Sequence, residues 1–276
     1  MTERKSNKEI ERSIIKEYRK EIFRKFNKAL DEYELIKEGD RIAVCISGGK
    51  DSFLLAKCMQ EIQKHGNKKF DLEFICMDPG FKEEDMEKIL DNAKHMGIPI
   101  KTFKTRIFKI AQSKDRGGCY LCARMRRGSL YEIAEKLGCN KIALGHHFTD
   151  VTTTTMINIL YSGQFKTMMP KVRSTNHTIM ELIRPLYFVD EERIKSWVKA
   201  NGLEFLHCNC PIQDYREANN IEIEDAREKM KALIRSLKEK DPDVEKKIFR
   251  ATENVNLDMV LGYKKDGKYH DFLSEY

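Results

Sequence analysis

The sequence predicts an α/β protein: a parallel sheet with helices on both faces, and helical extensions at the N- and C-terminal ends. Short apolar runs alternate with helix-period segments between residues 41 and 161, the order typical of βαβ units. The first run, 41–46, is nearly continuous in apolar residues, which suits a strand covered on both faces. It ends in a Gly-Gly turn that leads directly into a helix-period segment.

The other elements follow from periodicity and turn residues. Further strands are predicted at 71–77, 98–103, 141–144, 178–186 and 203–206. Helices are predicted at 8–36 with a break near Lys28, from the Gly-Gly turn to about 65, and at 83–95, 120–137, 150–161, 191–200, 221–238 and 244–257. Gly97, Gly138 and Gly202 close three of these helices, because glycine suits the end of a helix. The stretch 261–276 receives no assignment.

The composition favours a cytoplasmic protein without a membrane partner. The 276 residues can bury a substantial core, and the formal charge of +7 is a modest excess. No apolar run approaches the roughly 18 residues that span a membrane, and the first residues lack the apolar core of a signal peptide. We therefore expect the eight cysteines to be reduced, metal-bound or catalytic rather than paired in structural disulfides.

The N-terminal helix is amphipathic, and one of its faces is strongly basic. The basic residues are Lys8, Arg12, Lys16, Arg19, Lys20, Arg24, Lys25 and Lys28. Such a face is either a solvated surface or a contact for a phosphate backbone.

The turn after the first strand carries the residues of a phosphate site. Glycines let a backbone approach a ligand closely, and the free N–H groups of a helix start point at an anion. Lys50 adds a positive charge, and two serines add hydroxyl groups. The predicted contacts are Ser47, Gly48, Gly49, Lys50, Asp51 and Ser52. The spacing matches neither the common P-loop nor the dinucleotide-binding glycine motif.

Ligands of parallel sheets bind outside the carboxyl ends of the strands. The turns after Ile46, Met77 and Leu144 are therefore expected to face one crevice.

Two pairs of cysteines have the spacing of ligands. Cys119 and Cys122 form C-x-x-C at a predicted helix start, where backbone amides and the arginines that follow favour thiolate. This pair is either a redox pair or half of a zinc site. With Cys208 and Cys210, four thiolates would close a tetrahedral zinc site, whereas three would hold an iron–sulfur cluster with one iron open. The other cysteines are interpreted as small buried hydrophobic residues: Cys45, Cys58, Cys76 and Cys139.

These motifs resemble a known family. SGGKDS resembles the PP-loop of the ATP pyrophosphatases, which split ATP into AMP and pyrophosphate. From about Glu38 to Leu257 the chain resembles the TtcA family, the tRNA 2-thiocytidine synthetases. The matching stretches are GDRIAVCISGGKDS, CYLCARMRRGSLY, NKIALGHH, INILYSGQFKTMMPK and LIRPLY. Related thiouridine synthetases carry extra zinc-binding cysteine pairs at both ends. No cysteine lies before Cys45 or after Cys210 here, which favours the TtcA branch.

The resemblance implies the adenine-nucleotide alpha-hydrolase-like fold of the PP-loop ATPases. It divides the chain into an N-terminal basic helix at 1–38, a PP-loop domain with an iron–sulfur site at 39–212, and a C-terminal helical extension at 213–276. It implies ATP-dependent tRNA thiolation, in which a base carbonyl oxygen is adenylated and sulfur is then transferred from an iron–sulfur cluster. The expected partners are tRNA, a sulfur donor (a cysteine desulfurase or sulfide) and a second copy of the chain in a homodimer.

The implied cofactors are ATP, Mg²⁺ and a 4Fe–4S cluster. The phosphates would lie on the loop with Lys50, and Mg²⁺ would bridge them with Asp51 as a ligand. Met77 and Gly145 would flank the nucleoside. Three cysteines hold the cluster in that family. These would be Cys119, Cys122 and either Cys208 or Cys210, with Cys208 preferred because it directly follows a predicted strand, and zinc is the alternative.

The chain departs from the family pattern at one motif. The family usually reads Gly-His-His-x-Asp-Asp, followed two residues later by Glu or Gln, whereas this chain has Thr149 before Asp150 and then threonines at 152–155. We assign Asp150 the catalytic or magnesium-binding role. His146 and His147 are either part of the site or buried residues without a chemical role.

Two other functions remain open. One is a PP-loop sulfurtransferase or ligase acting on a small molecule or a different nucleobase, which a loss of tRNA binding would favour. The other is a non-catalytic RNA-binding relative, which intact ATP cleavage would exclude.

Overall fold

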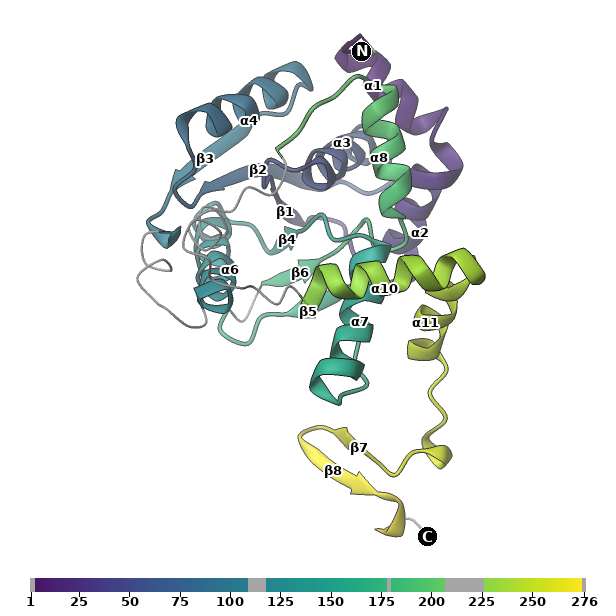
Figure 1. Ribbon diagram of the computed structural model, residues 1–276. Helices are drawn as coiled ribbons and strands as arrows, with labels where there is room; N and C mark the ends of the chain where they lie inside the picture. The colour runs from purple at the N-terminus through teal and green to yellow at the C-terminus, as the bar shows by residue number, and fades with distance from the viewer. Residues whose placement is uncertain (1–2, 109–117, 178–179, 207–225, 275–276) are drawn as a thin grey trace, which may run out of the picture. The chain divides into compact units, whose positions relative to one another are not determined.

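The computed structural model describes residues 3–108, 118–177, 180–206 and 226–274 (Figure 1). The chain forms two compact units, one of residues 1–150 and 169–224, the other of residues 151–168 and 225–276. The predicted division at residues 38 and 212 stays a prediction. Within the described ranges, no helix is both long enough and apolar enough to cross a membrane.

The first unit contains a six-stranded sheet in the order β3-β2-β1-β4-β6-β5 among the described residues. Its strands are β1 (Arg41–Cys45), β2 (Asp71–Asp78), β3 (Ile100–Lys104), β4 (Lys141–Ala143), β5 (Lys171–Arg173) and β6 (Glu181–Ile183). Its helices are α1 (Asn7–Ile15), a π-helix (Arg19–Phe23), α2 (Arg24–Glu32), α3 (Lys50–His65), α4 (Glu83–His95), α6 (Gly118–Lys136) and α8 (Glu191–Ala200). Helix α7 (Phe148–Ser162) begins in this unit and continues into the second. The predicted parallel sheet is confirmed, because only β5 pairs antiparallel in it.

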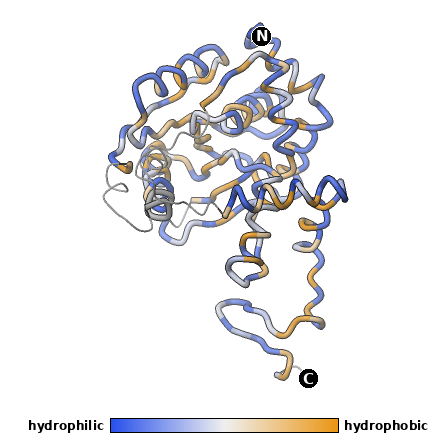
Figure 2. The backbone as a smooth tube through the Cα atoms, viewed as in Figure 1, coloured by the Kyte–Doolittle hydropathy of each residue, from blue (hydrophilic) through white to orange (hydrophobic). Residues whose placement is uncertain are grey.

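The sheet is organised around β1. Ile42 pairs in parallel with Leu72 of β2 on one side and with Lys141 of β4 on the other. The strand residues Ile42 and Val44 are fully buried, which explains the continuous apolar run. Figure 2 shows this hydrophobic centre inside the more hydrophilic helices α4 and α2. The chain runs outward from β1 to β3 and then returns to β4, so the strand order reverses between β1 and β4.

Helices cover both faces of the sheet. Tyr131 and Ala134 of α6 pack in one core with Cys45, Ile75 and Ile142 of the sheet. Helix α3 lies on the opposite side, together with α8 (Figure 1). Two layers of helices enclosing a parallel sheet leave its carboxyl edge as the open side.

One strand prediction was wrong, and another had the wrong bounds. The stretch 203–206 forms no strand, and its alternating burial comes instead from packing, because Phe205 stacks on Phe53 of α3 with ring centroids 5.0 Å apart. The strand predicted at 178–186 is shorter, at Glu181–Ile183, and its antiparallel partner β5 was missed. Strand β5 has three residues, Lys171–Arg173, all exposed or half-buried, and this is too short a segment for a periodic pattern that predicts a strand.

The N-terminal helix breaks earlier than the predicted site near Lys28. The N–H groups of Ile22 and Phe23 both donate to the carbonyl of Tyr18, and a π-helical turn follows α1. This turn keeps Ile22 in the core with Phe26 of α2, and both are fully buried. Tertiary packing therefore determines where the N-terminal helix breaks.

The second unit contains α10 (Ala226–Lys240), α11 (Val244–Glu253) and a hairpin of β7 (Gly262–Lys265) with β8 (Lys268–Asp271). The hairpin occupies the stretch that the sequence left unassigned. The last predicted helix ends at Glu253 rather than at 257, where a short 3₁₀ turn, Leu257–Met259, stands instead.

A buried ion pair holds the amino ends of the strands. Lys141 of β4 lies 2.7 Å from Asp40, and the two side chains are 3% and 5% exposed. Asp40 also accepts hydrogen bonds from the backbone N–H of Lys37 and from the side-chain amide of Asn140. Because both charged groups are removed from solvent, loss of either one would lower the free energy of unfolding.

We expect Asp40→Asn to lower the free energy of unfolding by about 3 kcal/mol, because it removes the nearer carboxylate of the buried Lys141 ammonium and leaves only Glu181, at 3.6 Å. Urea unfolding measures this. The control is Lys101→Met, which removes an exposed pair with Glu73 and is expected to cost at most about 1 kcal/mol. Equal losses in the two variants would contradict the structural role of the buried pair.

Candidate functional site

The Gly-rich turn joins β1 to α3 at the centre of the carboxyl edge. Gly48 has a φ of +87°, and a Cβ atom there would lie 2.8 Å from Leu206 Cδ1 and 2.9 Å from Ile89 Cδ1. Both the backbone conformation and the space therefore require glycine. Gly49 is the N-cap of α3, so the free amides of the helix start lie at the turn.

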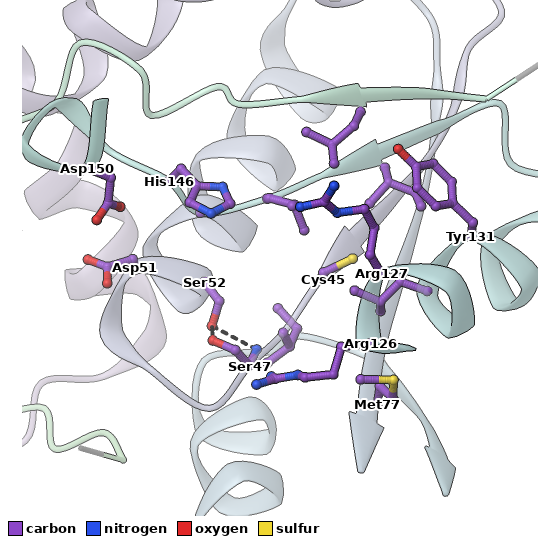
Figure 3. Close-up of a pocket in the computed structure, with 16 residues that line it drawn as sticks. Cys45, Ser47, Asp51, Ser52, Met77, Arg126, Arg127, Tyr131, His146 and Asp150 are labelled. Atoms are coloured by element: carbon purple, nitrogen blue, oxygen red, sulfur yellow. Dashed lines mark hydrogen bonds between the residues drawn. The ribbon is translucent and has the colours of Figure 1, made fainter. Parts of the chain in front are cut away.

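Internal hydrogen bonds fix the turn (Figure 3). The hydroxyl of Ser52 donates to the Gly49 carbonyl at 2.8 Å, and its oxygen accepts from the Ser47 N–H at 3.1 Å. Ser52 is 3% exposed, so its hydroxyl stabilises the loop from the protein interior. These hydrogen bonds stabilise the conformation in which the loop presents the amides of the helix start.

The turn after β4 closes against the start of α3. A Cβ atom on Gly145 would lie 3.0 Å from the carbonyl carbon of Asp51 and 3.1 Å from the nitrogen of Ser52. A side chain at position 145 would push the two backbones apart by a few tenths of an ångström. The loops after β1 and β4 thereby form the two sides of one crevice.

A cavity of about 390 Å³ opens at this crevice. Cys45, Met77 and Leu144, at the ends of three neighbouring strands, contribute to its wall. The predicted convergence of the three turns is therefore confirmed. Arg126, Arg127 and Tyr131 of α6 line the same cavity (Figure 3). Its volume is in the range of sites for small ligands.

A buried imidazole lies between two carboxylates at the edge of this cavity. His147 Nε2 is 3.5 Å from Asp150 Oδ2 and 3.9 Å from Asp51 Oδ1. The backbone N–H of His147 also donates to Asp150 Oδ2 at 3.2 Å. Asp51 Oδ1 is buried and has no hydrogen-bond partner among the described residues. His146 lines the cavity itself.

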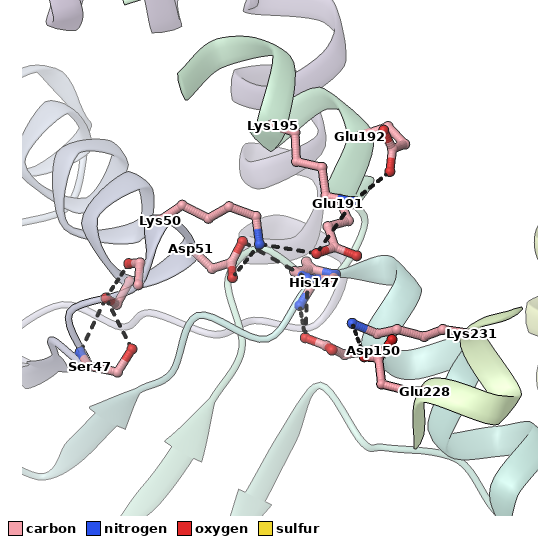
Figure 4. A network of polar contacts seen from close by, with 12 residues as sticks. Ser47, Lys50, Asp51, His147, Asp150, Glu191, Glu192, Lys195, Glu228 and Lys231 are labelled. Carbon is pink, nitrogen blue, oxygen red and sulfur yellow. Dashed lines mark hydrogen bonds and ion pairs between the residues drawn. The ribbon is translucent and has the colours of Figure 1, made fainter. Parts of the chain in front are cut away.

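Lys50 is held by two carboxylates (Figure 4). Its Nζ lies 3.1 Å from Asp51 Oδ2 and 3.1 Å from Glu191 Oε1. Burial lowers the pKa of Lys50, but the two carboxylates raise it by more, and the net pKa lies above its ordinary value. The ammonium is therefore charged at neutral pH. Sequence reasoning missed Glu191, because an acidic residue in the first turn of a helix is already explained by the helix dipole.

A second cavity, of about 960 Å³, lies on the other side of the loop. Ser47, Asp51 and Arg126 line both cavities, so the two cavities meet at the Gly-rich turn. The lining of the second cavity combines apolar residues with charged residues of both signs, and its carboxylates are Asp51, Asp85, Glu191 and Glu204. The apolar residues are Phe81, Phe108, Val198, Leu203, Phe205 and Leu206, and the lysines are Lys50, Lys88, Lys195 and Lys199.

The structure places the predicted ligand cysteines only in part. Positions 119 and 122 fall within α6, whose later residue Arg126 lines both cavities, but their side chains lie outside the described residues. Cys208 and Cys210 lie outside the described residues as well. The chain runs toward them from Leu206, whose N–H donates to the Gly48 carbonyl at 3.2 Å. In the described part of the chain, no three metal-ligating side chains come together.

The other four cysteines are buried, as predicted. Burial raises the pKa of the Cys76 thiol to about 12 and that of Cys139 to about 11, and it raises those of Cys45 and Cys58 further. These thiols are therefore protonated and unsuited to metal ligation or nucleophilic attack.

Comparisons with known proteins place the chain in a family. The PP-loop domain model matches residues 18–216. The tRNA-cytidine(32) 2-sulfurtransferase of Syntrophotalea carbinolica is 35% identical over 85% of this chain and 90% of that protein. The protein of the same name from Pelobacter propionicus is 34% identical, over 87% of each chain. The chain belongs to the tRNA-cytidine(32) 2-sulfurtransferase family.

A solved structure shares the fold of this family member. The U34-tRNA thiolase NcsA from Methanococcus maripaludis, solved with its [4Fe–4S] cluster, superposes with a TM-score of 0.66 at 20% identity. The match covers 84% of this chain and 76% of that one. The predicted PP-loop α/β fold is thereby confirmed.

We expect Gly48→Ala to abolish nucleotide binding, because the methyl group would push Leu206 and Ile89 away from the loop and strain its backbone. Calorimetric titration with ATP measures the binding, and urea unfolding measures the stability. The control is Gly39→Ala, which has a similar φ of +77° but no atom within 4 Å of the added Cβ. Gly39→Ala should lose about 1–2 kcal/mol of stability from its backbone conformation alone and should bind ATP normally, whereas Gly48→Ala should lose more than that because its methyl group also clashes with Leu206 and Ile89. Normal ATP binding by Gly48→Ala would contradict the assignment of the loop.

Proposed function

We propose that this protein catalyses ATP-dependent thiolation of a cytidine in tRNA, by adenylation of a base carbonyl oxygen followed by sulfur transfer. The relatives named above are sulfurtransferases for tRNA cytidine 32, and the substrate class is taken from them. The observation that carries the proposal is the meeting of two cavities at one phosphate loop. One cavity suits a nucleoside, and the other provides space beside the loop for the target base and the sulfur.

ATP would bind with its nucleoside in the first cavity. Met77 and Leu144 supply apolar surface there, and Gly145 lets the backbone approach. The phosphates would lie on the amides at Gly48 and Gly49, where the helix start favours an anion. Arg126 has no ion pair with any described residue and lines both cavities, so it can neutralise phosphate charge at their junction.

The carboxylates at the loop fit Mg²⁺. Asp51 Oδ1 is a buried oxygen without a hydrogen-bond partner among the described residues, and a cation would satisfy it. Asp150 borders the same group of atoms, because Asp150 Oδ2 and Asp51 Oδ1 lie 3.5 Å and 3.9 Å from one nitrogen, His147 Nε2. Mg²⁺ usually takes one or two carboxylates and fills its shell with water and phosphate oxygens, so two protein ligands suffice. We propose that Asp51 and Asp150 fill this role and that Thr149 contributes no charge.

The iron–sulfur site would lie beside the second cavity. Cys119, Cys122 and one of Cys208 and Cys210 would hold the cluster, which when bound would supply sulfide as the nucleophile. The described neighbours fit such a group, because Phe108, Phe205 and Leu206 give the second cavity an apolar wall, and apolar surroundings suit an iron–sulfur cluster. The hydrogen bond from Leu206 to Gly48 ties this wall to the phosphate loop. Sulfide and the activated base would thus be held close together, which is a proximity effect.

The N-terminal helices offer a surface for tRNA. Six basic side chains there are exposed and have no ion pair with any described residue: Lys8, Arg12, Lys16, Arg19, Lys20 and Arg24. Lys25 and Lys28 are instead paired with Asp190 and Glu32. The sulfur donor, the homodimer and the cytoplasmic location stay predictions from the sequence.

The function is tested with Lys50→Ala. Loss of the ammonium should lower ATP-dependent thiolation at least about a hundredfold, because the phosphates lose a preorganised charge contact. Nucleoside analysis of tRNA after anaerobic incubation measures the product, and AMP formation measures the first step. Lys64→Ala, on an exposed part of the same helix, should remain active. Near-normal thiolation by Lys50→Ala, or no thiolated cytidine with the wild type, would contradict the proposal.

The tRNA surface is tested by neutralising Arg19, Lys20 and Arg24 together to Gln. If each contacts a phosphate, the slope of log affinity against log salt should become shallower by about two units. Filter binding of tRNA at several salt concentrations measures it. The control is a triple change of exposed lysines elsewhere, at Lys69, Lys94 and Lys136. An unchanged slope in the first variant would assign the basic face to solvent.

The cluster ligands are tested by single Cys→Ala variants. Anaerobic wild-type protein should be brown and contain about four iron atoms per chain. Cys119→Ala and Cys122→Ala should lose iron and activity, and so should only one of Cys208→Ala and Cys210→Ala, because three thiolates leave one iron open for sulfide. Retention of full iron by both of the latter variants, or one zinc ion in place of iron, would overturn the ligand assignment.

A further inference from the structure

Lys50 of the phosphate loop is fixed by a residue far away in the sequence. Glu191 Oε1 lies 3.1 Å from Lys50 Nζ, across 141 positions of the chain. The Lys50 and Glu191 side chains are 24% and 14% exposed, so solvent screens their contact only partly. Glu191 is the first residue of α8, where an acidic side chain is stabilised by the helix dipole.

The number of donors on Lys50 suggests what this contact does. An ammonium group has three N–H donors, and among the described residues Lys50 uses two, toward Asp51 Oδ2 and Glu191 Oε1. One donor is left for a ligand. A lysine side chain has four rotatable carbon bonds and would otherwise lose much rotamer freedom when it binds a phosphate. Because Asp51 and Glu191 already fix the Lys50 side chain before a ligand binds, the loss of rotamer freedom does not oppose phosphate binding.

The start of α8 is itself tied to the N-terminal helices. Asp190, its N-cap residue, forms an ion pair with Lys25 of α2. Trp197 of α8 is fully buried and donates from Nε1 to Ser13 Oγ of α1 at 3.1 Å. Glu191 is therefore carried by a rigid, packed element rather than by a mobile loop. A carboxylate on such an element can set the position of a flexible side chain.

We propose that Glu191 is a positioning residue, which holds the Lys50 ammonium ready for the phosphates of the nucleotide. The inference rests on the proposed function, in which Lys50 contacts those phosphates. The alternative is that Glu191 holds Lys50 away from the ligand. In that case, removal of Glu191 would strengthen nucleotide binding. Lys195, with its Nζ 3.9 Å from Glu191, lies on the side that faces the second cavity.

The experiment measures ATP binding directly, by calorimetry with the full chain and Mg²⁺, and then kcat and KM for ATP. Glu191→Ala should weaken ATP binding about tenfold or more, the size expected for the loss of a hydrogen bond to a charged group. Glu191→Gln keeps an acceptor and should retain part of the affinity. The matched control is Glu192→Ala: Glu192 is the next residue, is 70% exposed and, among the described residues, forms its ion pair with Lys195 alone. It should bind ATP as the wild type does.

A double-mutant cycle with Lys50→Ala separates positioning from a general structural effect. If Glu191 acts through Lys50, Glu191→Ala should have almost no further effect on ATP binding once Lys50 is gone. Additive losses, unchanged binding or tighter binding in Glu191→Ala would each overturn the proposal. Because binding is measured without tRNA or cluster chemistry, this result is independent of whether thiolated cytidine is formed. A wild type that binds ATP but makes no thiolated product would refute only the proposed function.

Discussion

The close approach of three segments at Gly48 is the constraint on which the site depends. The loop after β1 passes so near to Leu206 and Ile89 that a side chain at position 48 would meet both. Gly145 brings the loop after β4 equally close to the start of α3. These two contacts fix the loop between a nucleoside-sized cavity and a larger, partly apolar one. A loop free to move would join the two cavities without defining where phosphates bind.

Charges are distributed between the two edges of the sheet with different consequences. At the amino edge, Asp40 and Lys141 are buried and fully paired, which serves the fold. At the carboxyl edge, Asp51 keeps one oxygen without a hydrogen-bond partner among the described residues, and Lys50 keeps one donor. Unused capacity of this kind is costly in a buried place unless a ligand satisfies it. The difference between the two edges is what marks the carboxyl edge as functional.

The departure at Thr149 leaves a site with fewer charges than the family motif. Asp150 accepts a hydrogen bond from the backbone of His147 and lies near its imidazole, so it also organises the start of α7. The same carboxylate also lines the first cavity. His147 is 2% exposed, which fits a supporting residue, whereas His146 lines the cavity. The two neighbouring histidines therefore have different surroundings, which their sequence does not reveal.

Local sequence determined the elements whose signals lie within a few residues. These elements include β1, with its continuous apolar run, and α4 and α8, with their helical periodicity. The structure confirms where the sequence placed them and the Gly-rich loop. The stretch at 203–206 was misread because burial against Phe53 produces the same alternation as a strand. Glu191 was missed because its partner Lys50 is 141 residues away. Only the tertiary structure decides such pairs, because a contact between distant segments depends on how whole elements pack and leaves no pattern in either segment alone.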